Sequence, residues 1–148
     1  MKGLVFRGFE KMILQHYGAG FWERLMDETP LKTTGGGFIG PETYPDEDLA
    51  ALIATTSHLT GESQISLTSQ FGRFLFPHFA RIHPVFMKPG LTAKSFLQTV
   101  DGLIHVEVRK LHAGANLPEF RYEDPAPNRL VMVYRSQRKL CHLATGLI

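Results

Sequence analysis

The chain has 148 residues, which suits one domain rather than two. Hydrophobic residues make up 43% of it and charged residues 20%, a globular composition with enough apolar mass for a core and a pocket. The net charge of +2 comes without a basic tract, so no nucleic-acid partner is indicated. Cys141 is the only cysteine, which excludes an intramolecular disulfide and fits a reducing cytoplasm.

Apolar residues at helical spacing predict a helix over about 2–17, followed by a shorter one through Phe21 and Met26. Charged residues interrupt the apolar run at the start of the chain, so we expect neither a signal peptide nor membrane insertion. The stretch 33–37 is predicted to be a connector, because it lacks the Gly-Lys-Ser/Thr ending of a phosphate-binding loop.

Two further helices are predicted in the first half. Pro45 and the acids that follow it suit the first turn of a helix that ends at Gly61. The next helix begins at about Ser63 and runs through Phe79, and we expect Pro77 to kink or break it.

The second half is predicted to mix helix and strand. A key helix begins at Thr92 or Ser95 and runs to about His112, before Gly114. Its expected apolar stripe comprises Phe96, Val100, Leu103, Ile104, Val108 and Leu111. Strand-like runs at 118–123 and 129–135 flank a turn at 124–128, and a final helix covers 139–148.

This order predicts an α+β fold. We expect a helical subdomain over about 1–62, followed by a subdomain over about 63–148 that holds the key helix, an antiparallel hairpin and the C-terminal helix. The chain stops within an apolar run, and a two-stranded hairpin alone is marginally stable. We therefore expect further strands to complete the sheet in a longer chain.

The candidate site combines His105 on the key helix with Tyr134, Ser136 and Arg138 after the second strand run. Alternate side chains of a strand share a face, so two hydroxyls and a guanidinium are expected to converge as donors suited to carboxylates. One histidine among apolar residues and a grip on two propionates are what a haem needs.

Other interpretations of these residues stay open. A histidine among apolar helix residues is more often a core residue, and Tyr-x-Ser-x-Arg also occurs on ordinary exposed strands. His105 and His112 lie seven residues apart and would share a helix face, but a zinc ion requires about four ligands. The sequence shows no diagnostic nucleophile motif and no paired catalytic carboxylates, so we do not expect an enzyme.

These residues resemble the haem–nitric oxide/oxygen-binding (H-NOX) domain, the sensor module of soluble guanylate cyclase and of stand-alone bacterial proteins. The resemblance covers essentially the whole chain; besides the candidate site it rests on residues 1–5, 45–48, 71–73, 117–120 and 146–148. It implies that His105 is the proximal ligand of a haem b iron, that Tyr134, Ser136 and Arg138 bind the propionates, and that Pro118 presses on the porphyrin. The implied distal or ring-edge lining is Val5, Phe9, Leu75, Phe79, Leu143 and Leu147.

The resemblance also bears on gas selectivity. Oxygen-binding members carry a distal tyrosine three positions before the glycine that is Gly146 here, and this chain has Leu143 instead. Leu75 and Phe9 donate no hydrogen bond either, and His142 should face away because a helix turns by about 100° per residue. We expect NO and CO to bind and oxygen to be excluded.

A signalling role follows from the resemblance. NO binding would weaken the bond to His105, let the haem relax against Pro118 and release the key helix, a two-state switch. The implied partner is a histidine kinase or a cyclic-nucleotide or cyclic-di-GMP enzyme. Two alternatives remain: a haem-free scaffold domain for such a partner, and a haem enzyme, which would need distal acid–base residues.

Overall fold

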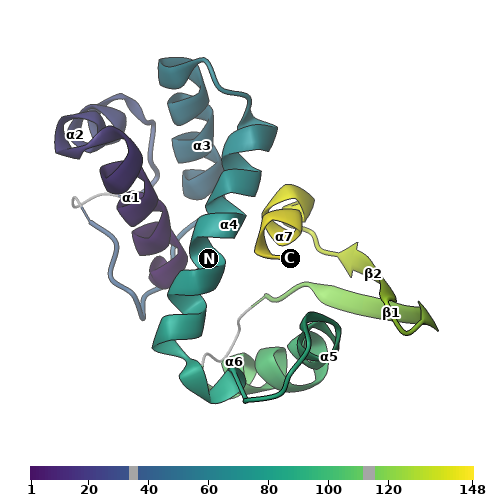
Figure 1. Cartoon of the computed structure of the whole chain (residues 1–148). Coiled ribbons are helices and arrows are strands. Elements are labelled where there is room, and N and C mark those ends of the chain that lie inside the picture. The colour runs from purple at the N-terminus through teal and green to yellow at the C-terminus, as the bar shows by residue number, and fades with distance from the viewer. Residues whose placement is uncertain (34–36, 112–115) are drawn as a thin grey trace.

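The computed structural model describes residues 1–33, 37–111 and 116–148. Its first half consists of α1 (Gly3–Tyr17), α2 (Ala19–Glu28), α3 (Asp46–Thr60) and α4 (Gln64–Ile82). The long helix α4 runs through the centre, with α1, α2 and α3 on one side and the rest of the chain on the other (Figure 1). The predicted positions of these helices are confirmed. Thr34 to Gly36 of the predicted connector, and His112 and Gly114 at the predicted end of the key helix, lie outside the described residues.

Local sequence explains the ends of α3 and α4. Helix α3 follows Pro45, has three acidic residues in its first turn and ends at Gly61, which adopts a left-handed φ of 76°. The hydroxyl of Ser63 caps α4 by accepting a hydrogen bond from the backbone N–H of Ser66 at 3.2 Å. Pro77 does not break α4, which continues to Ile82; the fixed φ of proline is compatible with a helix, although the ring removes one backbone donor.

The predicted key helix is interrupted in the structure. After the 3-10 turn η1 (Pro84–Phe86), α5 (Ala93–Thr99) leads into a π-helical turn η2 (Val100–Ile104), and α6 (His105–Leu111) follows. In η2, the backbone N–H of His105 bonds to the carbonyl of Val100, five residues back. This wider turn changes the helical register. Leu103 is therefore 39% exposed, and its predicted place in the apolar stripe is wrong.

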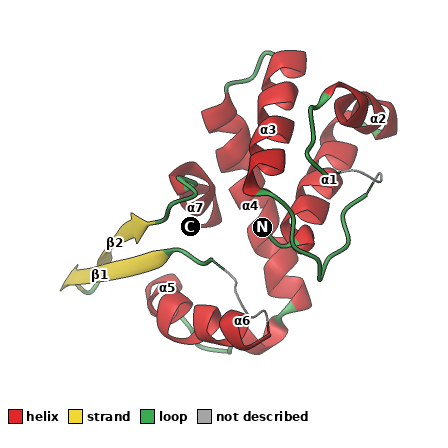
Figure 2. Cartoon of the chain, turned by 180° about the vertical axis from the view of Figure 1, so that it is seen from behind, coloured by secondary structure: helices red, strands yellow, loops and turns green. Residues whose placement is uncertain are grey.

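The hairpin consists of β1 (Glu119–Ala126) and β2 (Arg129–Arg135), which pair antiparallel with Phe120 opposite Tyr134. Strand β1 extends into the predicted turn, with an irregular register between Glu123 and Ala126. The chain then turns into α7 (Cys141–Leu147), which lies beside α4 (Figure 2).

A clasp joins α5 to the tip of the hairpin. The ammonium of Lys94 donates to a carboxylate oxygen of Asp124, to the carbonyl of Ala126 at 2.6 Å and to the carbonyl of Pro127 at 3.2 Å. The side-chain amide of Gln98 donates to the other carboxylate oxygen of Asp124 at 3.0 Å. We call these five residues the Lys94 clasp.

The core lies between α1, α3 and α4, and its fully buried residues include Phe6, Phe9, Leu52, Phe71 and Leu75. Helices α4 and α7 touch backbone to backbone at Gly72 and Gly146, where a Cβ on Gly146 would lie 2.1 Å from the carbonyl oxygen of Ser69. Within the described residues, no helix is both long enough and apolar enough to cross a bilayer.

Candidate functional site

An apolar cavity of about 680 Å³ lies between the start of α1, the C-terminal half of α4, the α5–α6 segment, the hairpin and α7. Cavities of roughly 300–1,000 Å³ with mostly apolar walls and a few converging polar groups are the usual form of cofactor sites. The polar groups of this wall include His105 and the three residues of the predicted propionate grip. The fold therefore collects the sequence-predicted polar residues around one hollow.

His105 is the first residue of α6 and lies in the cavity wall, with 12% of its side chain exposed. Its Nδ1 lies 3.1 Å from Oδ1 of Asp101, and its ring stacks on Phe120 with centroids 5.9 Å apart. Burial lowers the pKa of His105 by more than the hydrogen bond to Asp101 raises it. The imidazole is therefore neutral at neutral pH, the form that ligates a metal.

Tyr134, Ser136 and Arg138 line the same cavity, but only Tyr134 does so from a strand. Strand β2 ends at Arg135, so Ser136 and Arg138 reach the cavity from the turn before α7. Within that turn, the backbone N–H of Arg138 donates to the hydroxyl of Ser136 at 3.2 Å. Strand alternation is thus the wrong reason for the placement of Arg138, although all three residues do converge.

Arg138 belongs to a small ion cluster at the edge of the cavity. Its Nε donates to Oδ2 of Asp46 at 2.7 Å, and the N-terminal ammonium of Met1 lies 2.7 Å from Oδ1. Burial by itself would raise the pKa of Asp46, but hydrogen bonds and charges from the ammonium and Arg138 outweigh it and lower that pKa. Because Asp46 engages Nε, the remaining guanidinium donors of Arg138 suit a further carboxylate.

The predicted apolar lining is mostly present. The cavity wall includes Pro118, Val5, Leu75, Phe79, Leu143 and Leu147. Phe9 does not line it. One turn further along α1 than Val5, Phe9 is fully buried and packs edge-to-face on Phe71, with ring centroids 5.2 Å apart. His142 is exposed on α7, while Leu143 is buried with 9% of its surface accessible.

Several wall residues were missed by the sequence interpretation. Phe120 and Met132 lie on the hairpin with Tyr134, and the period-two alternation of these strands could have identified them. His83 also lines the cavity from the C-terminal end of α4, and no local pattern marks it. Among the described residues, no group of three or more His, Cys, Asp or Glu could hold a metal ion. His112, the partner in the zinc alternative, is not described.

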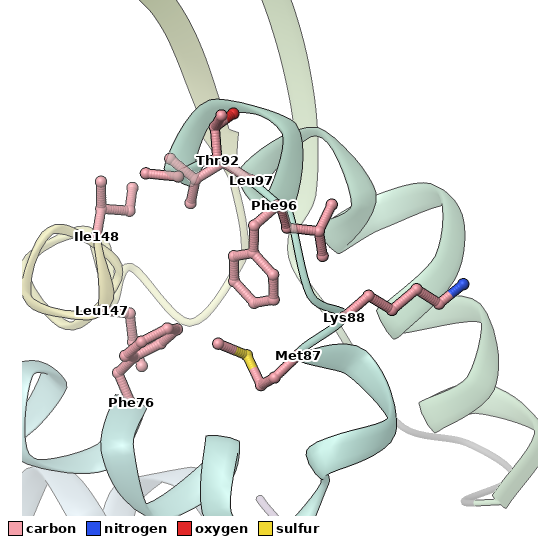
Figure 3. A pocket seen from close by; sticks show the side chains of 10 residues that line it. Phe76, Met87, Lys88, Thr92, Phe96, Leu97, Leu147 and Ile148 are labelled. Carbon is pink, nitrogen blue, oxygen red and sulfur yellow. The ribbon is translucent and has the colours of Figure 1, made fainter.

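A smaller pocket of about 280 Å³ continues the apolar space between α4, α5 and the end of α7. Figure 3 shows Phe76 beside Leu147 on one side of it and Met87 below Phe96 on the other. These four residues also line the large cavity, so the two hollows share a wall. The residues present fit a haem: an apolar slot, a neutral histidine that is 12% exposed, and hydroxyl and guanidinium donors at one edge.

Fold and site together define a cofactor-binding α+β domain whose polar groups match a haem. The sequence model of the Haem-NO-binding family matches residues 2–148, so the chain belongs to this family of H-NOX gas-sensor domains. Domains of this family bind haem and are sensors rather than enzymes. Comparison with curated protein sequences returned no match.

Solved structures agree with this assignment. The unliganded Fe(II) H-NOX protein from K. algicida is 26% identical with a TM-score of 0.90, and the match covers 99% of this chain and 79% of that one. The S. oneidensis H-NOX protein in its Fe(II)NO state is 25% identical with a TM-score of 0.89 over 99% and 81% of the two chains. The Shewanella woodyi H-NOX domain in its Fe(II)CO state is 28% identical, with a TM-score of 0.84 over 99% and 77%.

Proposed function

We propose that this chain binds haem b in the large cavity and senses NO, with CO as a second ligand. The main support is that a mostly shielded, neutral histidine and three carboxylate-binding donors line one apolar cavity of cofactor size. His105 would ligate the iron, and Tyr134, Ser136 and Arg138 would hold the propionates. The bound haem iron supplies the coordination position at which a diatomic gas binds.

Gas selectivity is proposed to come from the apolar wall contributed by α1, α4 and α7. Val5, Leu75 and Leu143 line the cavity there, and none of these side chains can donate a hydrogen bond. Bound oxygen carries partial negative charge and depends on a nearby donor, whereas NO and CO do not. The apolar wall therefore supports NO and CO binding and disfavours oxygen.

The signal is proposed to leave through the helix that carries His105. His105 would hold the iron and Pro118, in the same cavity wall, would contact the porphyrin; NO bound at the iron would weaken its bond to His105. A weaker bond would free α6, and the parts of the chain at about 1–62 and 63–148 would then shift relative to each other. This is a two-state switch whose equilibrium the gas biases. The receiver is proposed to be a histidine kinase or a cyclic-nucleotide or cyclic-di-GMP enzyme, in a cytoplasmic setting that the single cysteine favours.

The first experiment is an anaerobic absorption spectrum of the reduced, haem-reconstituted chain, repeated with NO, with CO and with air. We expect a five-coordinate ferrous spectrum, new spectra with NO and with CO, and no stable oxygen complex. A stable oxygen complex would contradict the proposed selectivity, while absence of haem uptake would contradict the cofactor assignment.

His83 provides a matched control, because it is a second histidine in the wall of the same cavity. We expect His105→Ala to lose the five-coordinate spectrum and His83→Ala to retain it. If His83→Ala lost that spectrum and His105→Ala retained it, the iron ligand would be His83 and the proposed relay through α6 would be wrong.

A further inference from the structure

The carboxylate of Asp101 contacts one of the two ring nitrogens of His105. Oδ1 of Asp101 lies 3.1 Å from Nδ1 of His105. An ionised carboxylate only accepts hydrogen bonds, so the proton must sit on Nδ1 for this contact to form. The Nε2 atom of His105 is then left without a proton, with a lone pair to offer.

The π-helical turn brings the two side chains together. Asp101 lies within η2, and His105 is the first residue after η2. The two are four residues apart, a spacing at which side chains of a helix share a face. Isolated π turns inside longer helices are frequent at functional sites. Among residues 1–33, 37–111 and 116–148, the residue that this turn precedes is the one histidine of the cavity wall whose side chain is mostly shielded from solvent.

Within the described residues, no lysine or arginine pairs with Asp101, whose hydrogen-bond partner is the imidazole of His105. Its side chain is 31% exposed. Tyr122 of β1 lies close enough for the Asp101 charge to add to burial in raising the pKa of that tyrosine. The Tyr122 hydroxyl is buried and has no hydrogen-bond partner in the described part of the chain. Asp101 therefore lies near Tyr122 of the hairpin and contacts the imidazole of His105.

We propose that Asp101 is a positioning residue that fixes the tautomer and orientation of His105 and sets the strength of its bond to iron. This inference rests on the proposed haem-binding function and extends it to a residue outside the cavity wall. A carboxylate that accepts from Nδ1–H makes the imidazole a better electron donor, and such partners of metal-bound histidines tune affinity. In this chain the same contact opposes the release of His105, so Asp101 raises the threshold for signalling.

Two substitutions separate orientation from charge. Asp101→Ala removes the acceptor, whereas Asp101→Asn keeps an oxygen that can accept from Nδ1–H but removes the negative charge. Asp124→Asn is the matched control, because Asp124 is a carboxylate at the hairpin tip that pairs with Lys94 instead. Circular dichroism of all variants checks that the helices are intact.

The first measurement is the iron–histidine stretching frequency of the reduced, haem-loaded protein by resonance Raman spectroscopy. We expect the frequency to fall in Asp101→Ala, to take an intermediate value in Asp101→Asn and to stay unchanged in Asp124→Asn. Haem transfer from the ferric protein to an excess acceptor globin should be about 10- to 100-fold faster in Asp101→Ala, the usual effect of losing such a partner. Frequencies that are equal in wild type and Asp101→Ala would overturn the proposal while leaving haem binding intact.

The second measurement is the tautomer of His105 by nitrogen NMR of the histidine-labelled chain without haem. We expect the Nδ1–H form in wild type and Asp101→Asn, and a shift toward Nε2–H in Asp101→Ala. A wild-type chain with the Nε2–H form would overturn the positioning role. Absence of haem uptake by wild type would instead overturn the proposed function, and the role of Asp101 toward iron with it. If Asp101→Ala does not fold, the iron–histidine frequency of Asp101→Asn tests the proposal: a value below that of wild type supports it, and an equal value contradicts it.

Discussion

Gly146→Ala should destabilise the chain because the backbones of α4 and α7 touch at this residue. An added Cβ would lie 2.1 Å from the carbonyl oxygen of Ser69 and 2.9 Å from Cα of Gly72. Both atoms belong to backbone, so no side-chain rotation relieves the contact and α7 must move away. The helix would carry Leu143 with it, out of its buried position between α4 and the cavity.

The size of the effect follows from two opposing contributions. Overpacking in a well-packed core costs about 1–3 kcal/mol, and a backbone collision belongs at the upper end. Replacing glycine by alanine within a helix raises the free energy of unfolding by about 1 kcal/mol, because alanine has the higher helix propensity. We therefore expect Gly146→Ala to lower the free energy of unfolding by about 2 kcal/mol.

Urea unfolding followed by circular dichroism measures this difference. Gly20→Ala is the matched control, because Gly20 lies in α2 with no atom within 4 Å of an added Cβ. That change should stabilise by about 0.4–1 kcal/mol. A Cβ on Gly72 would meet the Leu143 carbonyl at 2.3 Å and Cα of Gly146 at 2.7 Å, so the double alanine variant should cost less than the two single changes together. If Gly146→Ala proved as stable as Gly20→Ala, the close crossing of α4 and α7 would be wrong.

Three further predictions concern single side chains. Asp46→Asn should cost about 1 kcal/mol or less near neutral pH, because the ion cluster is partly exposed. The pKa of Asp46 is lowered from 3.8 in the folded chain, so the ionised carboxylate stabilises the fold above that pH and this contribution is lost as the pH falls below it. The free energies of unfolding of wild type and Asp46→Asn, measured with urea, should therefore become equal in acid. The hydroxyl of Tyr17 donates to Glu62 at 2.7 Å, and burial together with this contact raises the pKa of Tyr17 to about 12. The protonated hydroxyl therefore stabilises the fold below pH 10, and this contribution is lost as the pH rises toward 12. Tyr17→Phe should remove the absorbance change of this tyrosine near pH 12. Leu143→Tyr should add a hydrogen-bond donor at the cavity wall and permit a stable oxygen complex. His142→Ala, on the exposed side of α7, should leave the spectra with each gas unchanged. Absence of an oxygen complex in Leu143→Tyr, or changed spectra in His142→Ala, would contradict these assignments.

The helices of the first half could be predicted because their signals are local. Spacing of apolar residues, the cap at Ser63 and the stop at Gly61 each act within a few residues of the helix that they delimit. The π turn could not be predicted in this way. The π turn shifts the helical register by less than one turn, and the residue composition around it does not change. Leu103 is therefore exposed, although its spacing from the other apolar residues of the helix predicts a place in the apolar stripe.

The candidate site was predictable only in part. Strand alternation could not show that β2 ends at Arg135, nor that Arg138 would reach the cavity from a turn and contact Asp46, 92 residues earlier in the chain. Phe9 and Val5 share a face of α1, and only the position of α4 decides that Phe9 packs on Phe71 while Val5 lines the cavity. Long-range packing of this kind leaves no periodic signal in the sequence.

The Lys94 clasp has a mechanical consequence for any motion that begins at His105. The α5–η2–α6 segment and the hairpin are joined at two separated places, by Lys94 and Gln98 at the hairpin tip and by His105 stacked on Phe120 near its base. Two attachments suppress rotation of one element about the other. We therefore expect the α5–η2–α6 segment and the hairpin to move together when His105 is displaced.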